Sequence, residues 1–495
     1  MAEENKSTSY GNIFKTTFLF GFVQVFKAVV SIIVNKIAAI FLGPTGMGLL
    51  GIYNSTISLI QTGASLGLNQ SAVRDVAEAN GTGDISRRDR VITITLKTVL
   101  YTGLLGLLAT ISLSYYISEW TLGDHSHAII YCLLAIVICL NIINDGRLAI
   151  IKGMRLMRYL AVSSIIGSCA GLFISVPLYY FLKIDGIVPA LLLSAILALC
   201  VSNYYIKKIG YTKIHLSLVD IKKEAMPMVK IGSVLMFVTF LQTIVAFFIN
   251  SFVRKEGGIE DVGFFSTGQY ILSGYFGLII TALTTDYYPR IAAVNNDNKE
   301  LKKELNKQTL VTIVLCSPMI VIFVALMPYL IKILYSEAFT PVVYYVKISI
   351  FSTIIMGCSN LLDMVLVVKQ NSRILLIFSV IIRVLQIISS FVLYSAYGLV
   401  GLGVSNVIVT AMHLVLVSFV AYKHYNIYYS KENMLLFAIE ISLTIVALLS
   451  MDVENLLHRS IMVIICIFTS ILFSFFCMRV YMKIDIFKYM KSKLC

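Results

Sequence analysis

The feature that most constrains this chain is a series of apolar runs, most of them about 18 or more residues long. A hydrocarbon core about 30 Å thick is crossed by roughly 20 helical residues, because each residue advances an α-helix by about 1.5 Å. With 58% apolar and 13% charged residues, the 495-residue chain has a mean hydropathy of +0.87, which excludes a water-soluble enzyme. We therefore predict an all-α polytopic membrane protein of fourteen transmembrane helices, at residues 13–42, 45–70, 91–117, 127–147, 160–182, 186–206, 228–253, 264–285, 308–335, 341–368, 374–395, 399–422, 434–450 and 460–482.

The stretch FLGPTGMGLLG at 41–51 contains a glycine cluster that resembles a phosphate-binding loop. No strand precedes it, so neither a dinucleotide-binding nor a Walker motif has its required context. We predict instead that it forms a tight turn between the first two helices. The first run is too long for a cleavable signal peptide and carries Lys27 and Lys36, so we expect the N-terminus to be retained.

Lysine and arginine residues are distributed unevenly between alternate loops. If the N-terminus is cytoplasmic, 30 of the 40 Lys and Arg residues fall on the cytoplasmic side, and five fall on the other side, namely Lys183, Arg254, Lys255, Lys332 and Arg459. The positive-inside rule then places both termini in the cytoplasm. The net charge of +14 reflects this topology and contact with anionic lipid, and does not indicate nucleic-acid binding.

The chain also repeats itself at an offset of 215 positions. This shift aligns Gly48 with Gly263, Asn54 with Gln269, and Gly186 with Gly401. Because the offset spans six predicted helices, an even number, both copies have the same orientation in the membrane. We predict two parallel six-helix lobes, residues 1–212 and 213–430, with a substrate path between them near the midplane. We expect residues 431–495 to form accessory helices 13 and 14 and a cytoplasmic tail.

Eight of the nine cysteines lie within apolar runs, and the ninth is the terminal Cys495. No CxxC or Cys/His spacing typical of a metal site occurs. We therefore expect neither a metal centre nor a disulfide framework, and no cofactor.

Three segments carry a resemblance to a known family. They are VNKIAAIFLGPTGMGLLGIYNSTISLI (34–60), LAIIKGMRLMRYLAVSSIIGS (148–168) and EDVGFFSTGQYILSGYFGLIITALTTDYYPRIAAV (260–294). The chain resembles the O-antigen translocases, a group that includes the flippase for enterobacterial common antigen. This group belongs to the multidrug/oligosaccharidyl-lipid/polysaccharide (MOP) exporter superfamily. The resemblance covers roughly residues 10–425, so the last two helices depart from the shorter, twelve-helix members.

The resemblance implies a multi-pass flippase of the bacterial inner membrane that acts in O-antigen, lipopolysaccharide or related polysaccharide biosynthesis. Its substrate would be an oligosaccharide linked to undecaprenyl diphosphate, moved from the cytoplasmic to the periplasmic leaflet by alternating access. Membrane lipids are further partners, and the polysaccharide polymerase and chain-length machinery are candidate ones. A sugar and a diphosphate cannot be hydrogen-bonded by hydrocarbon, so the protein must supply a polar path.

Polar residues at helical spacing inside the apolar runs are candidates for that path. Lys27 and Arg383 are the deepest cations, and such charges are costly unless they face water or an anion, so we interpret them as ligands for the diphosphate or an anionic sugar. Their alternative role is a structural ion pair. For Lys36 the alternative is snorkelling toward the periplasm, and for the other polar residues it is helix-helix hydrogen bonding. The predicted substrate-binding residues are Gln24, Lys27, Asn35, Lys36, Asn54, Gln61, Gln242, Asn250, Gln269 and Arg383.

Other functions stay open at this point. His413, Asp363 and Glu440 are candidates for coupling transport to an ion, although the sequence does not choose between a proton, sodium and substrate supply. A multidrug or cation antiporter of the same superfamily would need a deep carboxylate in its first lobe. An ion channel would also explain polar stripes. A glycan polymerase or glycosyltransferase would need a large extramembrane loop, and the outer loops at 118–126, 183–186 and 336–340 are too short, so we expect no enzyme.

The topology can be tested by cysteine labelling from each side of the membrane. Single cysteines introduced in 213–222 should react only from the cytoplasm, and those in 118–126 only from the periplasm, because basic loops are retained inside. The reverse labelling pattern would overturn the orientation.

Overall fold

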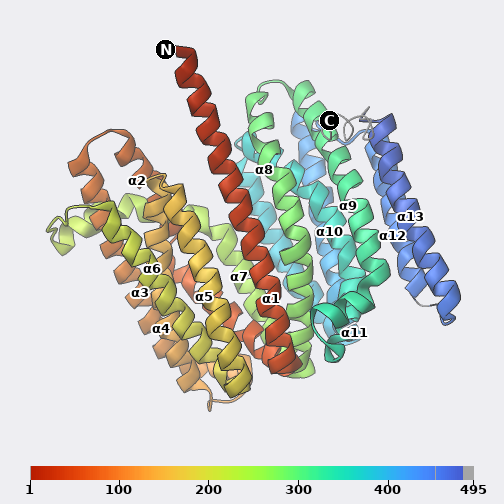
Figure 1. Ribbon diagram of the computed structural model, residues 1–495, viewed down its shortest axis with the longest axis horizontal. Helices are drawn as coiled ribbons and strands as arrows, with labels where there is room; N and C mark the ends of the chain where they lie inside the picture. The colour runs from red at the N-terminus through yellow and green to blue at the C-terminus, as the bar shows by residue number, and fades with distance from the viewer. Residues whose placement is uncertain (1, 452, 483–495) are drawn as a thin grey trace. The chain divides into compact units, whose positions relative to one another are not determined.

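The described part of the chain folds into α-helices with no β-strand among its residues (Figure 1). The computed structural model describes residues 2–451 and 453–482, and the side chains among them except those of 2–22, 218, 282, 285, 372 and 456. The predicted basic tail after residue 482, with Cys495, lies outside the described residues. The helices are α1 (Ala2–Ser65), α2 (Leu68–Gly81), α3 (Ile85–Leu122), α4 (Ala128–Gly153), α5 (Met157–Leu182), α6 (Ile187–Ile209), α7 (Leu218–Gln269), α8 (Gly277–Ala293), α9 (Asn298–Leu334), α10 (Val342–Val368), α11 (Ser372–Tyr425), α12 (Lys431–Met451) and α13 (Leu456–Val480), with short elements η1 (Lys183–Gly186), η2 (Tyr270–Phe276) and η3 (Glu337–Phe339).

Ten stretches of the described chain are long and apolar enough to cross a membrane. Four of them, at 23–65, 157–209, 219–281 and 373–425, have 43 to 63 residues, about twice what one crossing needs. Each contains a break in helical backbone, at Gly43, Lys183, Gly258 and Gly398 respectively. The all-helical membrane fold is therefore confirmed, whereas the total of fourteen spans stays a prediction.

The predicted duplication is visible in the backbone. Gly43 has φ 64° and ψ −171°, and Gly258, 215 positions later, has φ 89° and ψ 179°. The same offset relates Lys183 (φ 49°, ψ −126°) to Gly398 (φ 56°, ψ −137°). It also relates Arg155 to Gln370, which have φ values of 57° and 58°. A positive φ is uncommon outside glycine, so its recurrence at one offset indicates two copies of one ancestral backbone.

The two copies of the first turn meet within residues 1–263. A Cβ added to Gly48 would lie 2.0 Å from the Ile259 carbonyl oxygen, and one added to Gly263 would lie 2.1 Å from that of Pro44. Both pairs differ by the repeat offset, so each turn packs its glycine on the backbone of the other. Thr45 Oγ1 also donates a hydrogen bond to Glu260 Oε1 at 3.2 Å. Only glycine allows two backbones to approach this closely.

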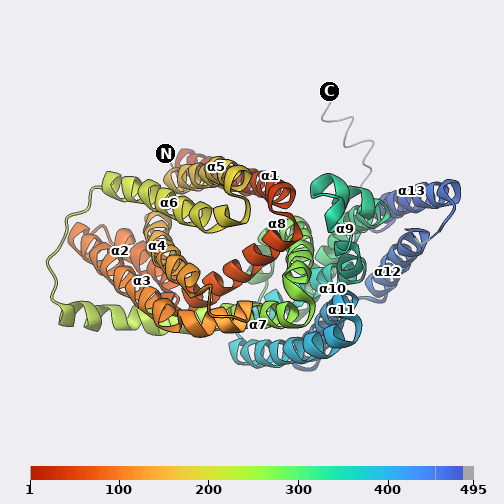
Figure 2. The same ribbon diagram turned by 90° about the horizontal axis from the view of Figure 1, so that it is seen from below.

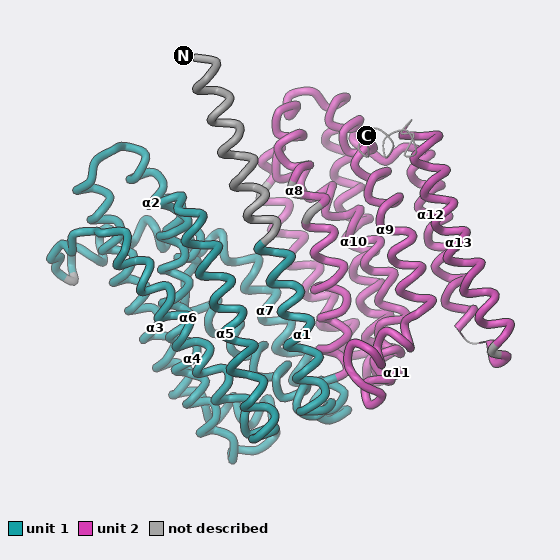
Figure 3. The backbone as a smooth tube through the Cα atoms, viewed as in Figure 1, with its two compact units in different colours: residues 1–263 teal, residues 264–495 magenta. Residues whose placement is uncertain are grey.

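The chain divides into two compact units, residues 1–263 and 264–495 (Figure 3). This division follows packing, and most of α7 therefore belongs to unit 1. There Gly67, with φ 67°, packs against the carbonyl of Gly232 on α7. Leu68, Val99, Ala149 and Met228 join α2, α3, α4 and α7 in one apolar cluster. The lobes at 1–212 and 213–430 follow the sequence repeat and stay a prediction.

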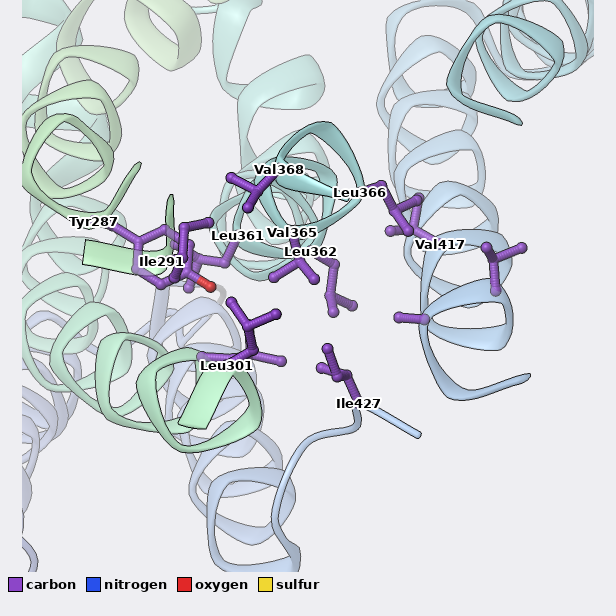
Figure 4. Close-up of a cluster of buried hydrophobic side chains, with 13 residues drawn as sticks. Tyr287, Ile291, Leu301, Leu361, Leu362, Val365, Leu366, Val368, Val417 and Ile427 are labelled. Carbon is purple, nitrogen blue, oxygen red and sulfur yellow. The ribbon is translucent and has the colours of Figure 1, made fainter. Parts of the chain in front are cut away.

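Unit 2 has its main core where α8, α9, α10 and α11 converge. Figure 4 shows Tyr287 and Ile291 of α8, Leu301 of α9 and Val417 of α11 around the buried face of α10. The accessory helices α12 and α13 pack on α9, beside it in both Figure 1 and Figure 2. Asn433 of α12 donates hydrogen bonds to the main-chain and side-chain oxygens of Asn306, at 2.8 and 3.0 Å. These contacts fix α12 to α9.

The glycine contact predicts a position-specific sensitivity. Gly48→Ala should lower the free energy of unfolding by about 1–3 kcal/mol, because the added methyl group overlaps a main-chain carbonyl that cannot easily move. Thermal unfolding of the purified protein in detergent measures this as a lower Tm. Gly167→Ala is the matched control, since no atom lies within 4 Å of its added Cβ. Equal Tm values for the two variants would contradict the close contact.

Candidate functional site

A polar pocket in unit 1 contains the first of the predicted ligands. It has a volume of about 400 Å³ and lies among α1, α2, α4 and α5. The break at Leu66 and Gly67, both with positive φ, ends α1 and starts α2, which brings Asn69 and Gln70 to the pocket. The lining residues are Val23, Gln24, Lys27, Asn69, Gln70, Val73, Asp145, Leu148, Ala149, Lys152, Leu160, Ala161 and Ser164.

Charges of both signs line this pocket. Lys27 of α1 and Lys152 of α4 contribute two exposed cations, and Asp145 of α4 contributes a carboxylate. Gln61, on the second half of α1, donates a hydrogen bond from Nε2 to Asp145 Oδ2 at 2.8 Å. The Gln61 amide therefore fixes the orientation of the carboxylate. Amide groups of Gln24, Asn69 and Gln70 supply further donors and acceptors of the kind that sugar hydroxyls need.

The structure brings only some of the predicted unit 1 residues together. Gln24 and Lys27 line the pocket, and Gln61 reaches it through Asp145. The other predicted residues of this unit do not line it. Asn250 is buried and donates to the Gly51 carbonyl at 3.4 Å, which is a helix-packing contact. Lys36 and Gln242 are exposed on α1 and α7, while Asn35 and Asn54 are half-buried on α1.

The predicted residues of unit 2 are separate from one another. Arg383 on α11 donates from Nη1 to Gln386 Oε1 at 2.6 Å, and its Nε is buried with no partner among the described residues. Gln269 at the end of α7 donates to the Tyr345 hydroxyl at 2.8 Å. It directly precedes the π-helical turn η2, a local distortion that often marks functional positions.

The three coupling candidates also lie in unit 2. His413 Nε2 lies 3.4 Å from Asp363 Oδ1, and the two side chains are 24% and 27% exposed. Protonation of His413 would turn this contact into an ion pair. Glu440 is fully buried on α12, a helix that packs on α9, and neither carboxylate oxygen has a hydrogen-bond partner in the described part of the chain. Burying an ionised carboxylate without partners is costly, so this environment keeps Glu440 a candidate for ion coupling.

Asp145 lines the pocket and is absent from the residues predicted from the sequence. A signal did exist, because Asp145, Leu148, Ala149 and Lys152 follow the i, i+3, i+4, i+7 spacing of one helix face. The partner Gln61 is 84 residues away, and only the fold brings it to Asp145.

Comparison with known proteins assigns the chain to a family. The family described as "Polysaccharide biosynthesis protein" matches residues 13–295, and the MatE family matches residues 235–392. A putative O-antigen transporter of Shigella flexneri is 24% identical over 303 residues, which are 60% of this chain and 70% of that protein.

Solved structures share the fold at low sequence identity. The lipid II flippase MurJ in an inward closed conformation superposes with a TM-score of 0.68 and 15% identity, covering 94% of this chain and all of that one. An inward-facing multidrug resistance MATE family transporter of the MOP superfamily has a TM-score of 0.67 and 15% identity, covering 85% of this chain and 99% of that one. These matches confirm the predicted resemblance: the chain is a multi-pass membrane protein of the polysaccharide biosynthesis protein family, with the fold of the MOP superfamily transporters.

Proposed function

We propose that this protein is a flippase that moves an undecaprenyl-diphosphate-linked oligosaccharide from the cytoplasmic to the periplasmic leaflet of a bacterial inner membrane. The substrate would be an O-antigen or related polysaccharide repeat unit. The observation that carries the proposal is the pocket in unit 1. Two cations, Lys27 and Lys152, line it together with the side-chain amides of Gln24, Asn69 and Gln70. The likeness to a putative O-antigen transporter supports it.

The pocket chemistry suits a charged head group. Lysine ammonium groups form strong hydrogen bonds with phosphate oxygens, and amides pair with sugar hydroxyls in both directions. A volume of about 400 Å³ is at the lower end of the range for small-ligand sites, so it fits a diphosphate with its first sugar and not a whole oligosaccharide. The remaining sugars and the isoprenoid tail would lie outside this pocket.

Asp145 has a clear role in such a cycle. An alternating-access flippase must return empty, and an uncompensated cation makes that step costly. With Asp145 in the same pocket, the charge of Lys27 is partly balanced when no substrate is present. The diphosphate then competes with the carboxylate for the ammonium group, so binding stays reversible.

The first prediction for this function concerns the cations. Lys27→Gln should lower the initial rate of transfer of a labelled lipid-linked oligosaccharide in proteoliposomes by at least about tenfold, which corresponds to ~1.4 kcal/mol. Arg383→Gln should do the same, because its guanidinium is largely buried and has an unpaired Nε among the described residues. Lys27→Arg should retain partial transport, since the charge is kept while the ammonium geometry is lost.

The control for these variants is Lys255→Gln, which removes an exposed charge far along the chain from the pocket. All four variants are compared at equal amounts of folded protein in the membrane. A normal transfer rate per folded molecule after loss of both Lys27 and Arg383 charges would show that these residues are structural.

A multidrug or cation antiporter of the same superfamily is the second candidate, and Asp145 favours it. This carboxylate supplies the acidic group in the first lobe that cation export requires, and the neighbouring Gln61 holds it in place. The pocket volume also suits a drug-sized cation. A glycan polymerase is less well supported, since nothing in the pocket pairs two carboxylates for glycosyl transfer.

Two opposite substitutions in this one pocket separate the candidates. For a flippase, Lys27→Gln abolishes transfer of the lipid-linked oligosaccharide, and Asp145→Asn leaves measurable transfer. For a cation antiporter, Asp145→Asn abolishes efflux of a fluorescent cationic drug, and Lys27→Gln leaves efflux intact because no anion is bound. Measuring both substrates with both variants in the same proteoliposomes gives the assignment. Drug efflux that depends on Asp145, with no oligosaccharide transfer by the wild-type protein, would refute the flippase.

A further inference from the structure

A second pocket in unit 1 lies on the other side of α4. It has a volume of about 630 Å³ and is bounded by α3, α4, α6 and the segment that follows α6. On α4 it contacts Ile143 and Arg147, whereas the first pocket contacts Asp145, Leu148 and Lys152. At about 100° per residue these two sets point in nearly opposite directions from the helix axis. The second pocket is therefore separated from the first by α4 itself.

The charge of this second pocket has one sign. Its lining includes Lys97, Arg147, Lys207, Lys213 and His215, and it includes no Asp or Glu. The other lining residues are Thr93, Leu96, Leu100, Ile143, Leu199, Asn203, Ile206, Tyr211 and Ile214. Four permanent cations around one cavity repel one another, and the pocket itself provides no anion to offset them. A ligand with negative charge would remove this cost.

The fold holds the cations together through the segment after α6. Gly210, with φ 68°, ends α6 in the left-handed conformation and turns the chain back toward α3. The Thr212 main-chain N–H then donates to Asp89 Oδ2 at 2.9 Å, and the same buried carboxylate pairs with Arg88. Lys97 Nζ donates to the Leu216 carbonyl at 3.3 Å. These two anchors on α3 place Lys213 and His215 over the cavity.

One buried donor in the pocket has no partner among the described residues. Arg147 donates from Nη1 to the Leu199 carbonyl at 3.3 Å, and its buried Nε has no partner among the described residues. The Tyr211 hydroxyl also lines the pocket and can donate, because a phenol is protonated at neutral pH, and burial raises its pKa further. A buried guanidinium nitrogen without an acceptor costs free energy, which an anionic oxygen would recover.

We propose that this pocket binds the phosphate group of an anionic phospholipid, with the headgroup held by Arg147, Lys207 and Lys213. Arginine and lysine are the residues that bind phosphate oxygens best. The source is a lipid because Leu100, at the rim, is 44% exposed on an apolar membrane-spanning helix, and Leu96 and Ile143 continue the apolar lining inward. An acyl chain could follow these residues from the bilayer. The proposal does not depend on which substrate the first pocket carries.

The test uses the full-length protein, purified in detergent, delipidated and examined by native mass spectrometry. Phosphatidylglycerol and phosphatidylcholine are titrated separately, so that the headgroup charge is the main variable. The wild-type protein should retain phosphatidylglycerol about tenfold more strongly. The variant Lys207→Gln with Lys213→Gln should lose most of that preference, since each cation near an anionic headgroup contributes substantially to binding.

The matched control is Lys222→Gln with Lys223→Gln, which removes two exposed charges from the nearby start of α7 but none from the pocket. It should keep the preference for phosphatidylglycerol. Both double variants change exposed side chains, so both should fold. A further variant, Arg147→Lys, keeps the positive charge at this position and should retain lipid binding. Equal loss of preference in both double variants, or equal binding of both lipids by the wild-type protein, would overturn the site.

Competition with inorganic phosphate shows whether the pocket binds the phosphate of a lipid headgroup or free phosphate. If added inorganic phosphate at millimolar concentration fails to displace phosphatidylglycerol, the site takes a lipid headgroup. If phosphate displaces the lipid from the wild-type protein and binds no more weakly to the pocket double variant than to the wild type, the pocket is not a phosphate site and the proposal fails.

Discussion

The absence of water from the hydrocarbon core is the constraint on which the rest of this structure depends. Every main-chain polar group within the bilayer must find a partner inside the protein, and continuous helices provide this. Polar side chains are tolerated only where they meet each other or line a cavity. The arrangement follows this rule closely: Asn406 donates to Ser352 at 2.9 Å, Ser474 donates to the Val314 carbonyl at 2.9 Å, and Gln61 holds Asp145. Lys27 and Lys152 instead line a cavity, the first pocket.

Helix packing in lipid depends on close fit, because lipid tails solvate apolar side chains as well as other helices do. The contact between the two repeated turns shows the result. Gly48 and Gly263 each bring the backbone of one turn against the carbonyl of the other, and both positions are equivalent in the duplication. Because the two turns are copies of one segment, a glycine at one position of that segment serves both sides of the contact. This explains why the glycines recur at the repeat offset while most side chains between them have diverged.

Sequence reasoning predicted the parts of the structure that depend on local pattern. Apolar runs gave the helices, the turn at Gly43 followed from its glycine and proline, and the offset of 215 reappears in the φ values of Gly43 and Gly258. Gln24 and Lys27 were predicted from their spacing on one helix and do line a pocket. Asp145 could not be paired with Gln61 in this way, because that contact is created by packing between α1 and α4. Asn250 was also predicted from the sequence to bind substrate, and only the fold shows that its side chain donates a hydrogen bond to the Gly51 main-chain carbonyl. Periodicity identifies a polar face, but tertiary packing decides whether that face lines a cavity or another helix.

The two pockets on opposite sides of α4 differ in the charges that line them: the first has charges of both signs, and the second has only positive charges. A transported ligand must leave, so its site cannot favour the bound state too strongly, and a ligand shifts a conformational equilibrium only by the difference in its affinity for the two states. The proposed role of the first pocket fits this requirement, because Asp145 lines it together with Lys27 and would compete with an anionic ligand for that cation. The second pocket has four permanent cations and no carboxylate, so an anion bound there has no competitor within the cavity. Mixed charge is thus suited to a ligand that passes through, and charge of one sign to a ligand that stays. Since Arg147 and Asp145 are two residues apart on α4, a single helix can present both environments, and a shift or rotation of α4 would change both at once.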